Sequence, residues 1–263
     1  ALTRNFQAAA LRETERVVAT IQDDLEDLDA VRRFLEGSVT VSRQQFHDFV
    51  TPILERHSFR ALEWLPRVPG DRRAEYEAAA RRDGLEGFQF TEPDAAGRLV
   101  SAADRAEYFP VYYLEPYAGN AAALGFAPGP AHPARGTVLA QARDRGQLTA
   151  TGRYILVQEP ASDPRFSILV FAPVYSGLPE KPEVEERRRR LRGFVLGVIR
   201  VSDVVADALR AIAPPDLAFR LLDLSAEDDQ RWLYDHPPTV IFSEPGVSDL
   251  RFHQDFPLAD RLW

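Results

Sequence analysis

Residues 107–176 include EYFPVYYLEP (107–116), TVLAQARDRG (137–146), LTATGRYILVQE (148–159) and FSILVFAPVYS (166–176). We expect a strand over the apolar and aromatic run at 108–114, a short helix that ends at Gly146, and a hairpin of strands 148–158 and 166–176 that turns at 160–164. One face of the hairpin carries apolar side chains of Ile155, Val157, Ile168, Val170 and Ala172, and the other carries Tyr154, Leu156, Leu169 and Phe171. A sheet that is apolar on both sides has to be covered on both sides by helices or loops.

The segment between the first strand and the helix, residues 116–136, is rich in Gly, Ala and Pro. Such a segment cannot fill a core by itself, and long loops in compact domains often line binding sites. The sequence therefore predicts a small concave site within residues 108–176 that binds a ligand. His132 lies between prolines in this loop and is expected to be exposed.

The first 36 residues predict one long amphipathic helix that Gly37 ends. Its apolar side chains recur every three or four residues: Phe6, Ala10, Val17, Ile21, Leu25, Leu28 and Leu35. The helix could pack on its own domain or also pair with a second copy. A second helix over 42–57 is indicated by the capping-box pattern of Ser42 and Gln45, with a kink near Pro52. His57, at its C-terminus, is expected to interact with the helix dipole or a carbonyl.

The segment LPEKPEVEERRRR (178–190) is dense in charge and reads as a boundary, with Arg187–Arg190 in a solvated loop. Beyond it, LRGFVLGVIRV (191–201) predicts a strand, VVADALRAIAP (204–214) a helix, and LAFRLLDL (217–224), RWLYDHPP (231–238) and TVIFSEPG (239–246) further strands. The terminal LRFHQDFPLADRLW (250–263) looks like an edge strand. Helices and short strands in this order favour an α+β fold.

The composition excludes several functions. The net charge of −8 opposes binding to nucleic acid, which needs clustered Lys and Arg. Cysteine is absent, so neither thiolate catalysis nor a Cys-ligated metal is available. No phosphate-binding loop, nucleophile elbow or HExxH pair occurs, and the five histidines are scattered, so we expect no catalytic residues, metal or cofactor. Met is absent even at position 1, which suggests a fragment of a longer protein or a processed form. No apolar run is long enough to span a membrane.

Four segments together carry a family resemblance: ALEWLPRVPGDRRAEYEAAARRDGLEGFQFTE (61–92), DRAEYFPVYYLEPYAGNAAALGF (104–126), ATGRYILVQE (150–159) with FSILVFAPVYSG (166–177), and LRGFVLGVIRVSDVV (191–205). They resemble the CHASE domain, the extracytoplasmic sensory domain of membrane histidine kinases and of nucleotide or dinucleotide cyclases. The resemblance implies an α+β fold with a long N-terminal stalk helix (1–37) and two PAS-like subdomains with antiparallel sheets. These are a membrane-distal ligand-binding one (38–178) and a membrane-proximal one (179–263).

The resemblance also implies a periplasmic or extracellular location, transmembrane helices on each side, a homodimer through the N-terminal helix and a cytoplasmic output domain. The domain itself would bind a small molecule and perform no catalysis. Plant cytokinin receptors of this family use an acidic side chain in the loop before the short helix, where this chain has Ala127. This difference argues against recognition of an adenine-type hormone. An apolar or aromatic ligand fits the implied lining better than a charged one.

The implied ligand-binding residues are mostly apolar: Tyr112, Leu114, Gly125, Phe126, Ala127, Leu139, Leu148, Thr149, Ala150, Tyr154, Phe171 and Pro173. Two alternatives stay open. The chain could be a dimerisation or protein-interaction ectodomain whose pocket is filled by side chains. A hydrolase would need convergent carboxylates or a Ser–His pair in the pocket.

Overall fold

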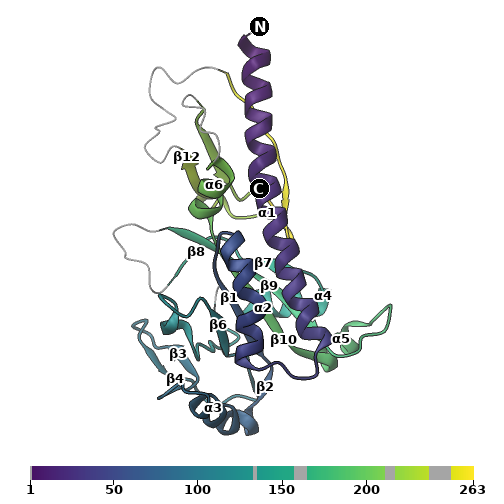
Figure 1. Cartoon of the computed structure of the whole chain (residues 1–263), viewed down its shortest axis with the longest axis vertical. Coiled ribbons are helices and arrows are strands. Elements are labelled where there is room, and N and C mark those ends of the chain that lie inside the picture. The colour runs from purple at the N-terminus through teal and green to yellow at the C-terminus, as the bar shows by residue number, and fades with distance from the viewer. Residues whose placement is uncertain (1, 133–134, 157–164, 211–216, 237–249) are drawn as a thin grey trace.

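The computed structural model describes residues 2–132, 135–156, 165–210, 217–236 and 250–263. Its longest element is the helix α1 (Leu2–Gly37), which runs along the long axis of the molecule (Figure 1). The central sheet lies beside the C-terminal half of α1, and α6 (Val201–Leu209) lies beside the middle of α1. The expected apolar stripe is present, because Val17, Ile21, Leu28 and Leu35 are buried together with Val31. Helical spacing therefore places one stripe of α1 against the body of the protein.

The second helix, α2 (Arg43–Arg56), begins with the predicted capping box. The Ser42 hydroxyl accepts from the backbone N–H of Gln45, and the Gln45 side chain accepts from the backbone N–H of Ser42. Pro52 lies inside the helix. The expectation that His57 interacts with the helix dipole or a carbonyl is wrong for its side chain. Its two ring nitrogens lie 2.9 Å from Asp24 and 2.6 Å from Asp27, both on α1. His57 thus joins the end of α2 to α1.

The core of the fold is one six-stranded antiparallel sheet in the order β6-β1-β10-β9-β7, with β8 also paired to β9. Its strands are β1 (Phe59–Pro66), β6 (Tyr113–Glu115), β7 (Thr149–Ala150), β8 (Tyr154–Ile155), β9 (Phe166–Tyr175) and β10 (Leu191–Arg200). The resemblance implied a subdomain boundary between residues 178 and 179, which would place β10 in the second subdomain. In the structure β10 lies in the middle of the central sheet, between β1 and β9. Its apolar side chains are buried on the two faces of the sheet, so the sheet extends past that boundary.

The two faces of the sheet are covered by different segments. One face, here called the helix face, packs on α1 and α2 through Leu62, Trp64, Ile168, Val195 and Ile199. A Cβ at Gly197 would lie 2.9 Å from the Phe59 ring and 3.2 Å from Leu28, so glycine permits this close approach of α1. The opposite face, the cavity face, carries Ala61, Leu65, Leu169, Phe171, Phe194 and Val198, and residues 109–126 and 138–142 cover it.

Four local predictions differ from the structure. The expected continuous strand at 148–158 is divided into β7 and β8, with residues 151–153 between them. The expected continuous strand at 108–114 is divided into β5 (Glu107–Tyr108) and β6, with Pro110 between them. The expected solvated loop at Arg187–Arg190 is the end of a helix, α5 (Val184–Arg190), which ion pairs stabilise: Arg188 lies 2.7 Å from Asp144 and 2.8 Å from Glu185. The terminal edge strand is a two-stranded pair, β13 (Pro257–Leu258) with β14 (Arg261–Leu262).

The remaining described elements are short. They are β2 (Val68–Pro69), η1 (Gly70–Arg72), α3 (Arg73–Arg82), β3 (Thr91–Pro93), β4 (Leu99–Ser101), η2 (Ala121–Ala123), α4 (Gly136–Arg145), β11 (Phe219–Leu222), η3 (Asp228–Gln230) and β12 (Trp232–His236). Gly146 ends α4 in the left-handed conformation, as predicted. The expected turn at 160–164 and the strand at 239–246 lie outside the described residues. The α+β class, with a long N-terminal helix and antiparallel sheets, is confirmed.

Candidate functional site

A partly enclosed cavity of about 50 Å³ lies between the cavity face of the sheet and the segments that cover it. This volume exceeds the roughly 10–15 Å³ that one water molecule requires and falls well below the ~300 Å³ of a typical drug-sized site. It is lined by Ala61, Glu63, Leu99, Asn120, Ala122, Ala123, Phe126, Arg135, Tyr154, Leu156, Leu169 and Val198. The cavity therefore fits a compact guest.

Three polar side chains enter this apolar setting, and all three are buried. Glu63 is 3% exposed, Asn120 1% and Arg135 6%. Glu63 belongs to β1, where alternation places it on the same face as Ala61 and Leu65. Asn120 precedes η2, and Arg135 precedes α4. The chain thus brings a carboxylate, an amide and a guanidinium to one cavity from three separate segments.

The hydrogen-bonding capacity of these groups is not used up within the protein. The closest approach of the Glu63 and Arg135 side chains is 3.9 Å, from Oε2 to Nη2, which is too long for a hydrogen bond. Glu63 Oε2, Arg135 Nη1 and Asn120 Oδ1 have no hydrogen-bond partner, whereas Asn120 Nδ2 donates to the carbonyls of Arg60 and Pro116. Buried polar groups are almost always hydrogen-bonded, so three unpaired atoms around one cavity require an explanation.

Burial also changes the protonation of the site. It raises the pKa of Glu63 to about 7, and the nearby Arg135 opposes the shift. Burial likewise raises the pKa of the Tyr154 hydroxyl. The pKa of His132 is lowered, first by burial and then by the positive charge of Arg135. The carboxyl group of Glu63 can therefore change charge near neutral pH.

Aromatic side chains form one wall of the cavity. The Arg135 guanidinium lies 4.8 Å from the centre of the Phe126 ring, a cation–π arrangement that holds it in place. His132 is half-buried, with its ring 5.8 Å from Phe126 and 6.5 Å from Tyr154. The prediction that His132 is exposed is therefore wrong, because the loop that carries it folds against the cavity face.

The structure places the predicted ligand-binding residues in four groups. Phe126 and Tyr154 line the cavity, whereas Leu148 and Pro173 line a separate open cleft of about 810 Å³ beside α1. Leu114, Leu139 and Phe171 pack in the core of the cavity face, and Thr149 pairs with Phe171. Tyr112, Ala127 and Ala150 belong to the core that includes the helix face, and Gly125 packs against the Gln89 carbonyl.

Ala127 does not line the cavity. It is 1% exposed, its N–H donates to the carbonyl of Thr91, and its own carbonyl accepts from Arg105. Its side chain therefore gives no information about the ligand. The polar residues Glu63, Asn120 and Arg135 were missed from the sequence. For Glu63 a signal was present, since it is the one carboxylate within the apolar strand ALEWLP.

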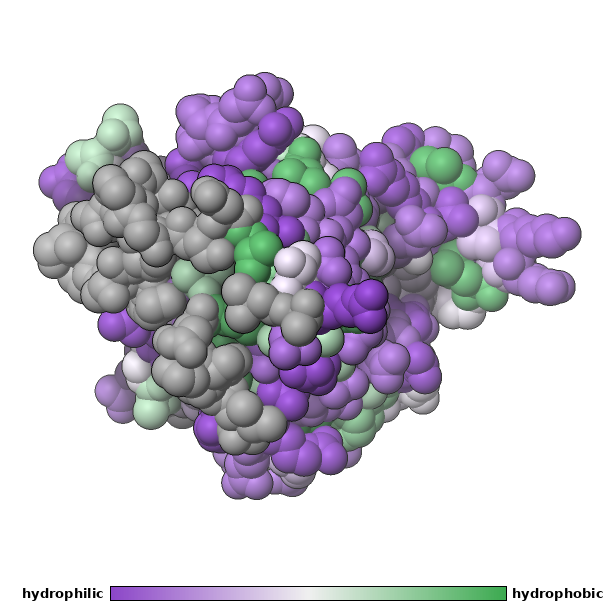
Figure 2. Space-filling model, turned by 90° about the horizontal axis from the view of Figure 1, so that it is seen from above, coloured by the Kyte–Doolittle hydropathy of each residue, from purple (hydrophilic) through white to green (hydrophobic). Residues whose placement is uncertain are grey.

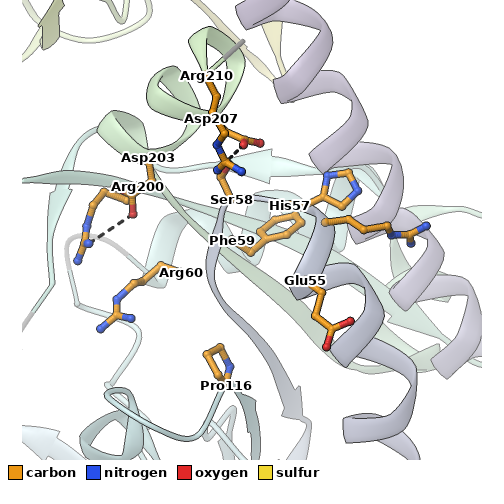
Figure 3. Close-up of a pocket in the computed structure, with 11 residues that line it drawn as sticks. Glu55, His57, Ser58, Phe59, Arg60, Pro116, Arg200, Asp203, Asp207 and Arg210 are labelled. Atoms are coloured by element: carbon orange, nitrogen blue, oxygen red, sulfur yellow. Dashed lines mark hydrogen bonds and ion pairs between the residues drawn. The ribbon is translucent and has the colours of Figure 1, made fainter.

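A third hollow, of about 300 Å³, lies where α2 and β1 meet α6 (Figure 3). Two of its arginines form ion pairs within the protein, whereas Arg60 Nε has no hydrogen-bond partner among the described residues. Arg200 lies 3.4 Å from Asp203, and Arg210 lies 2.7 Å from Asp207, as the dashed lines in Figure 3 mark. The cavity on the other side of the sheet is the better candidate for a ligand site because it is less open to solvent and combines an unpaired carboxylate oxygen with an unpaired guanidinium nitrogen.

Other features of the described residues add little chemistry. No group of His, Asp or Glu among them could hold a metal ion. None of the helices in the described part of the chain is long and apolar enough to cross a membrane. The face seen in Figure 2 is largely hydrophilic, with small hydrophobic patches between the polar side chains.

The CHASE domain family matches residues 39–234. Among solved structures, the chain is similar to the ligand-binding domain of the Pseudomonas aeruginosa PAO1 amino acid chemoreceptor PctC in complex with GABA, at 10% identity. The match covers 85% of this chain and 71% of that one, with a TM-score of 0.41. A second similar structure is "Methyl-accepting Chemotaxis protein X", at 16% identity over 84% of this chain and 72% of that one, also with a TM-score of 0.41. Comparison with curated proteins gives no match.

The family match extends from before α2 into β12 and includes every strand of the central sheet. The protein is therefore an extracytoplasmic sensory domain. It belongs to the CHASE domain family, as the resemblance indicated. A sensory domain agrees with the absence of catalytic motifs from the sequence.

Proposed function

We propose that the chain is the sensing part of a membrane receptor and binds a small molecule in the cavity formed around Glu63. Binding would bias a cytoplasmic output domain, a histidine kinase or a cyclase, across the membrane. The observation that supports this most directly is the partly enclosed cavity with three unpaired buried polar atoms, in a member of a sensory family. A ligand would supply the missing hydrogen-bond partners.

A direct route leads from the cavity to α1. Val198 of β10 lines the cavity, and β10 continues without a loop into α6. α6 packs on α1, as does β10 on its other face. A ligand that favours one position of β10 would therefore change how α6 and β10 hold α1, and it can do so only through different affinities for the two states.

The proposal includes a homodimer through α1. Several residues in the first third of this helix, Asn5 and Arg12 among them, are exposed in the single chain. Paired helices would convert a small change in the position of α1 into a change between the two output domains. Sedimentation of the ectodomain with and without residues 1–12 tests this part separately.

The central test is to fill the cavity. Ala61 is buried on β1 and lines the cavity, so Ala61→Leu would occupy it. The exposed Ala74 on α3 gives a matched control, Ala74→Leu. In a thermal-shift screen of small molecules, compounds that raise the Tm of the wild type and of Ala74→Leu should leave Ala61→Leu unchanged. Circular dichroism would establish that each variant is folded.

The second candidate is an ectodomain that dimerises or reads a partner protein. The small cavity volume favours it, because side chains already fill most of the space on the cavity face. Under this alternative no compound raises the Tm, and the intact receptor with Ala61→Leu signals as the wild type does. That pair of results would overturn the ligand-binding proposal.

A further inference from the structure

The unpaired atoms of the cavity differ in the partner that each requires. Arg135 Nη1 is a donor that carries positive charge, so its partner must be an acceptor and is best an anion. Glu63 Oε2 and Asn120 Oδ1 are acceptors, so their partners must be donors. The amide nitrogen of Asn120, Nδ2, already donates to the carbonyls of Arg60 and Pro116, and these two hydrogen bonds fix the direction of the amide oxygen.

The positions of these groups restrict the ligand further. Arg135 and Glu63 approach to 3.9 Å, so the donor and the acceptors lie close together in a cavity of about 50 Å³. A ligand that meets both must carry its own anionic and donor groups close together. An ammonium and a carboxylate separated by one or two carbon atoms have this arrangement.

We propose that the ligand is a small zwitterion of the amino acid type, with its carboxylate at Arg135 and its ammonium at Glu63 and Asn120. The inference rests on the proposed function and names the ligand class of that same site. The apolar remainder of the lining, including Leu156, Leu169 and Val198, receives the short side chain.

Simpler ligands leave part of the site unsatisfied. A monocarboxylate would meet Arg135 but lie beside Glu63, and an alkylamine would meet Glu63 but lie beside Arg135. Like charges in a buried site disfavour binding strongly. An apolar molecule, the class expected from the sequence, would leave all three atoms unpaired. A zwitterion alone neutralises both charges.

The test is isothermal titration of the whole ectodomain with four probes of similar size: L-alanine, propionate, ethylamine and propionamide. L-alanine should bind at least 10-fold more tightly than each of the other three. Equal or tighter binding of propionamide would overturn the inference, since a neutral amide cannot use the charges. If only an apolar compound bound, and Ala61→Leu abolished that binding, the inference would be overturned and the proposed function would remain intact.

A charge-specific variant provides a second, independent readout. Glu63→Gln keeps the shape of the side chain and removes its charge. It should therefore weaken the binding of L-alanine by about 10-fold or more and strengthen the binding of propionate. Arg135→Gln should weaken the binding of L-alanine and of propionate by about 100-fold, as expected when one partner of a buried charged contact is removed. The exposed Arg98, paired with Asp94 outside the cavity, gives the control Arg98→Gln, which should change neither affinity.

If Glu63 had only a structural role, Glu63→Gln would lower the affinities for L-alanine and for propionate together. This result would overturn the inference. If no probe or library compound binds and the intact receptor with Ala61→Leu signals normally, both the inference and the proposed function fail. The wild-type probe series decides the ligand class even where a variant does not fold.

Discussion

The two faces of the central sheet are built from the same strands and are used differently. On the helix face, β1 presents Leu62 and Trp64 to a continuous apolar core under α1 and α2. On the cavity face, the same strand presents Glu63 to a partly enclosed space and to Arg135. Alternation along one strand thus places stabilising contacts on one side and polar groups on the other.

The comparison shows how the fold tolerates an unsatisfied site. Buried charges without good hydrogen bonds destabilise a protein, and several kcal/mol is a typical size for such an effect. The helix face offsets this, because its large buried side chains, including Phe46, Leu28 and Ile168, contribute about 1.5–3 kcal/mol each. Apolar packing thereby supports a fold in which a few polar side chains of the cavity face are left free to recognise a ligand.

The largest effect on stability is expected on the helix face. Phe46 is fully buried on α2, with its ring 5.7 Å from Tyr113. Phe46→Ala should lower the free energy of unfolding by about 3–5 kcal/mol through lost burial and a new cavity, and leave ligand affinity unchanged in the folded fraction. Urea denaturation and titration of the ligand measure the two quantities.

The matched variant is Phe126→Ala on the cavity face, which should reduce ligand affinity more than stability because the ring supports Arg135 beside an existing cavity. If Phe126→Ala destabilised the fold more than Phe46→Ala, the division of labour between the faces would be wrong.

The next effect comes from the charged pair on the cavity face. Arg135→Leu leaves the buried carboxylate of Glu63 without its only nearby positive charge among the described residues and should cost about 3–4 kcal/mol. The double variant Glu63→Leu/Arg135→Leu should be as stable as the wild type or more stable, while binding no ligand.

Thermal and chemical denaturation of the wild type, Arg135→Leu and the double variant, together with ligand titration, tests whether the second substitution restores the stability that the first removes. A double variant less stable than Arg135→Leu would show that the pair stabilises the fold, contrary to the site proposed for it.

A smaller effect is expected at the polar contact of the helix face. His57 lies between Asp24, which is fully buried, and Asp27. His57→Ala should cost about 2–3 kcal/mol, because it leaves the Asp24 carboxyl without its partner and separates the end of α2 from α1. The exposed His47, 3.0 Å from Glu115, gives the control His47→Ala, which should change stability by less than about 1 kcal/mol. Equal effects at the two positions would mean that the α1 contact has no special role.

Much of the fold could be predicted from the sequence because its signals are local. The 3.6-residue spacing of Val17, Ile21 and Leu28 predicts α1, and the pairing of Ser42 with Gln45 predicts the start of α2. The position of β10 could not be predicted in this way. Its partners lie 127–140 residues earlier in β1 and in the preceding β9, and a charged segment of the chain gives no indication that the sheet continues beyond it.

The site was only partly predictable. Phe126 and Tyr154 belong to segments with a clear apolar pattern, and both line the cavity. Arg135 and Asn120 lie in a loop with no periodicity, so only the folded chain brings them to Glu63. The expectation of an apolar ligand followed from the apolar residues that periodicity reveals, and it missed the three side chains that give the cavity its polarity.

The smallest predicted effect is a pH dependence that separates the two faces. Because burial raises the pKa of Glu63 to about 7, the folded protein holds this proton more tightly than the unfolded chain, whose Glu pKa is near 4.5. The resulting stabilisation is fully present below about pH 4.5 and is lost as pH rises through about 7. Between pH 5 and pH 8 the ligand-free wild type should therefore lose about 1–3 kcal/mol more than Glu63→Gln.

The comparison of these two proteins isolates the cavity. Asp24, whose pKa burial raises to about 6, and the cavity neighbours Arg135, His132 and Tyr154 are present in both proteins, so their effects cancel in the difference. Urea denaturation at the two pH values measures it. An identical pH dependence in both proteins would mean that Glu63 keeps its charge throughout. The carboxylate would then be solvated or paired already and would need no ammonium from a ligand.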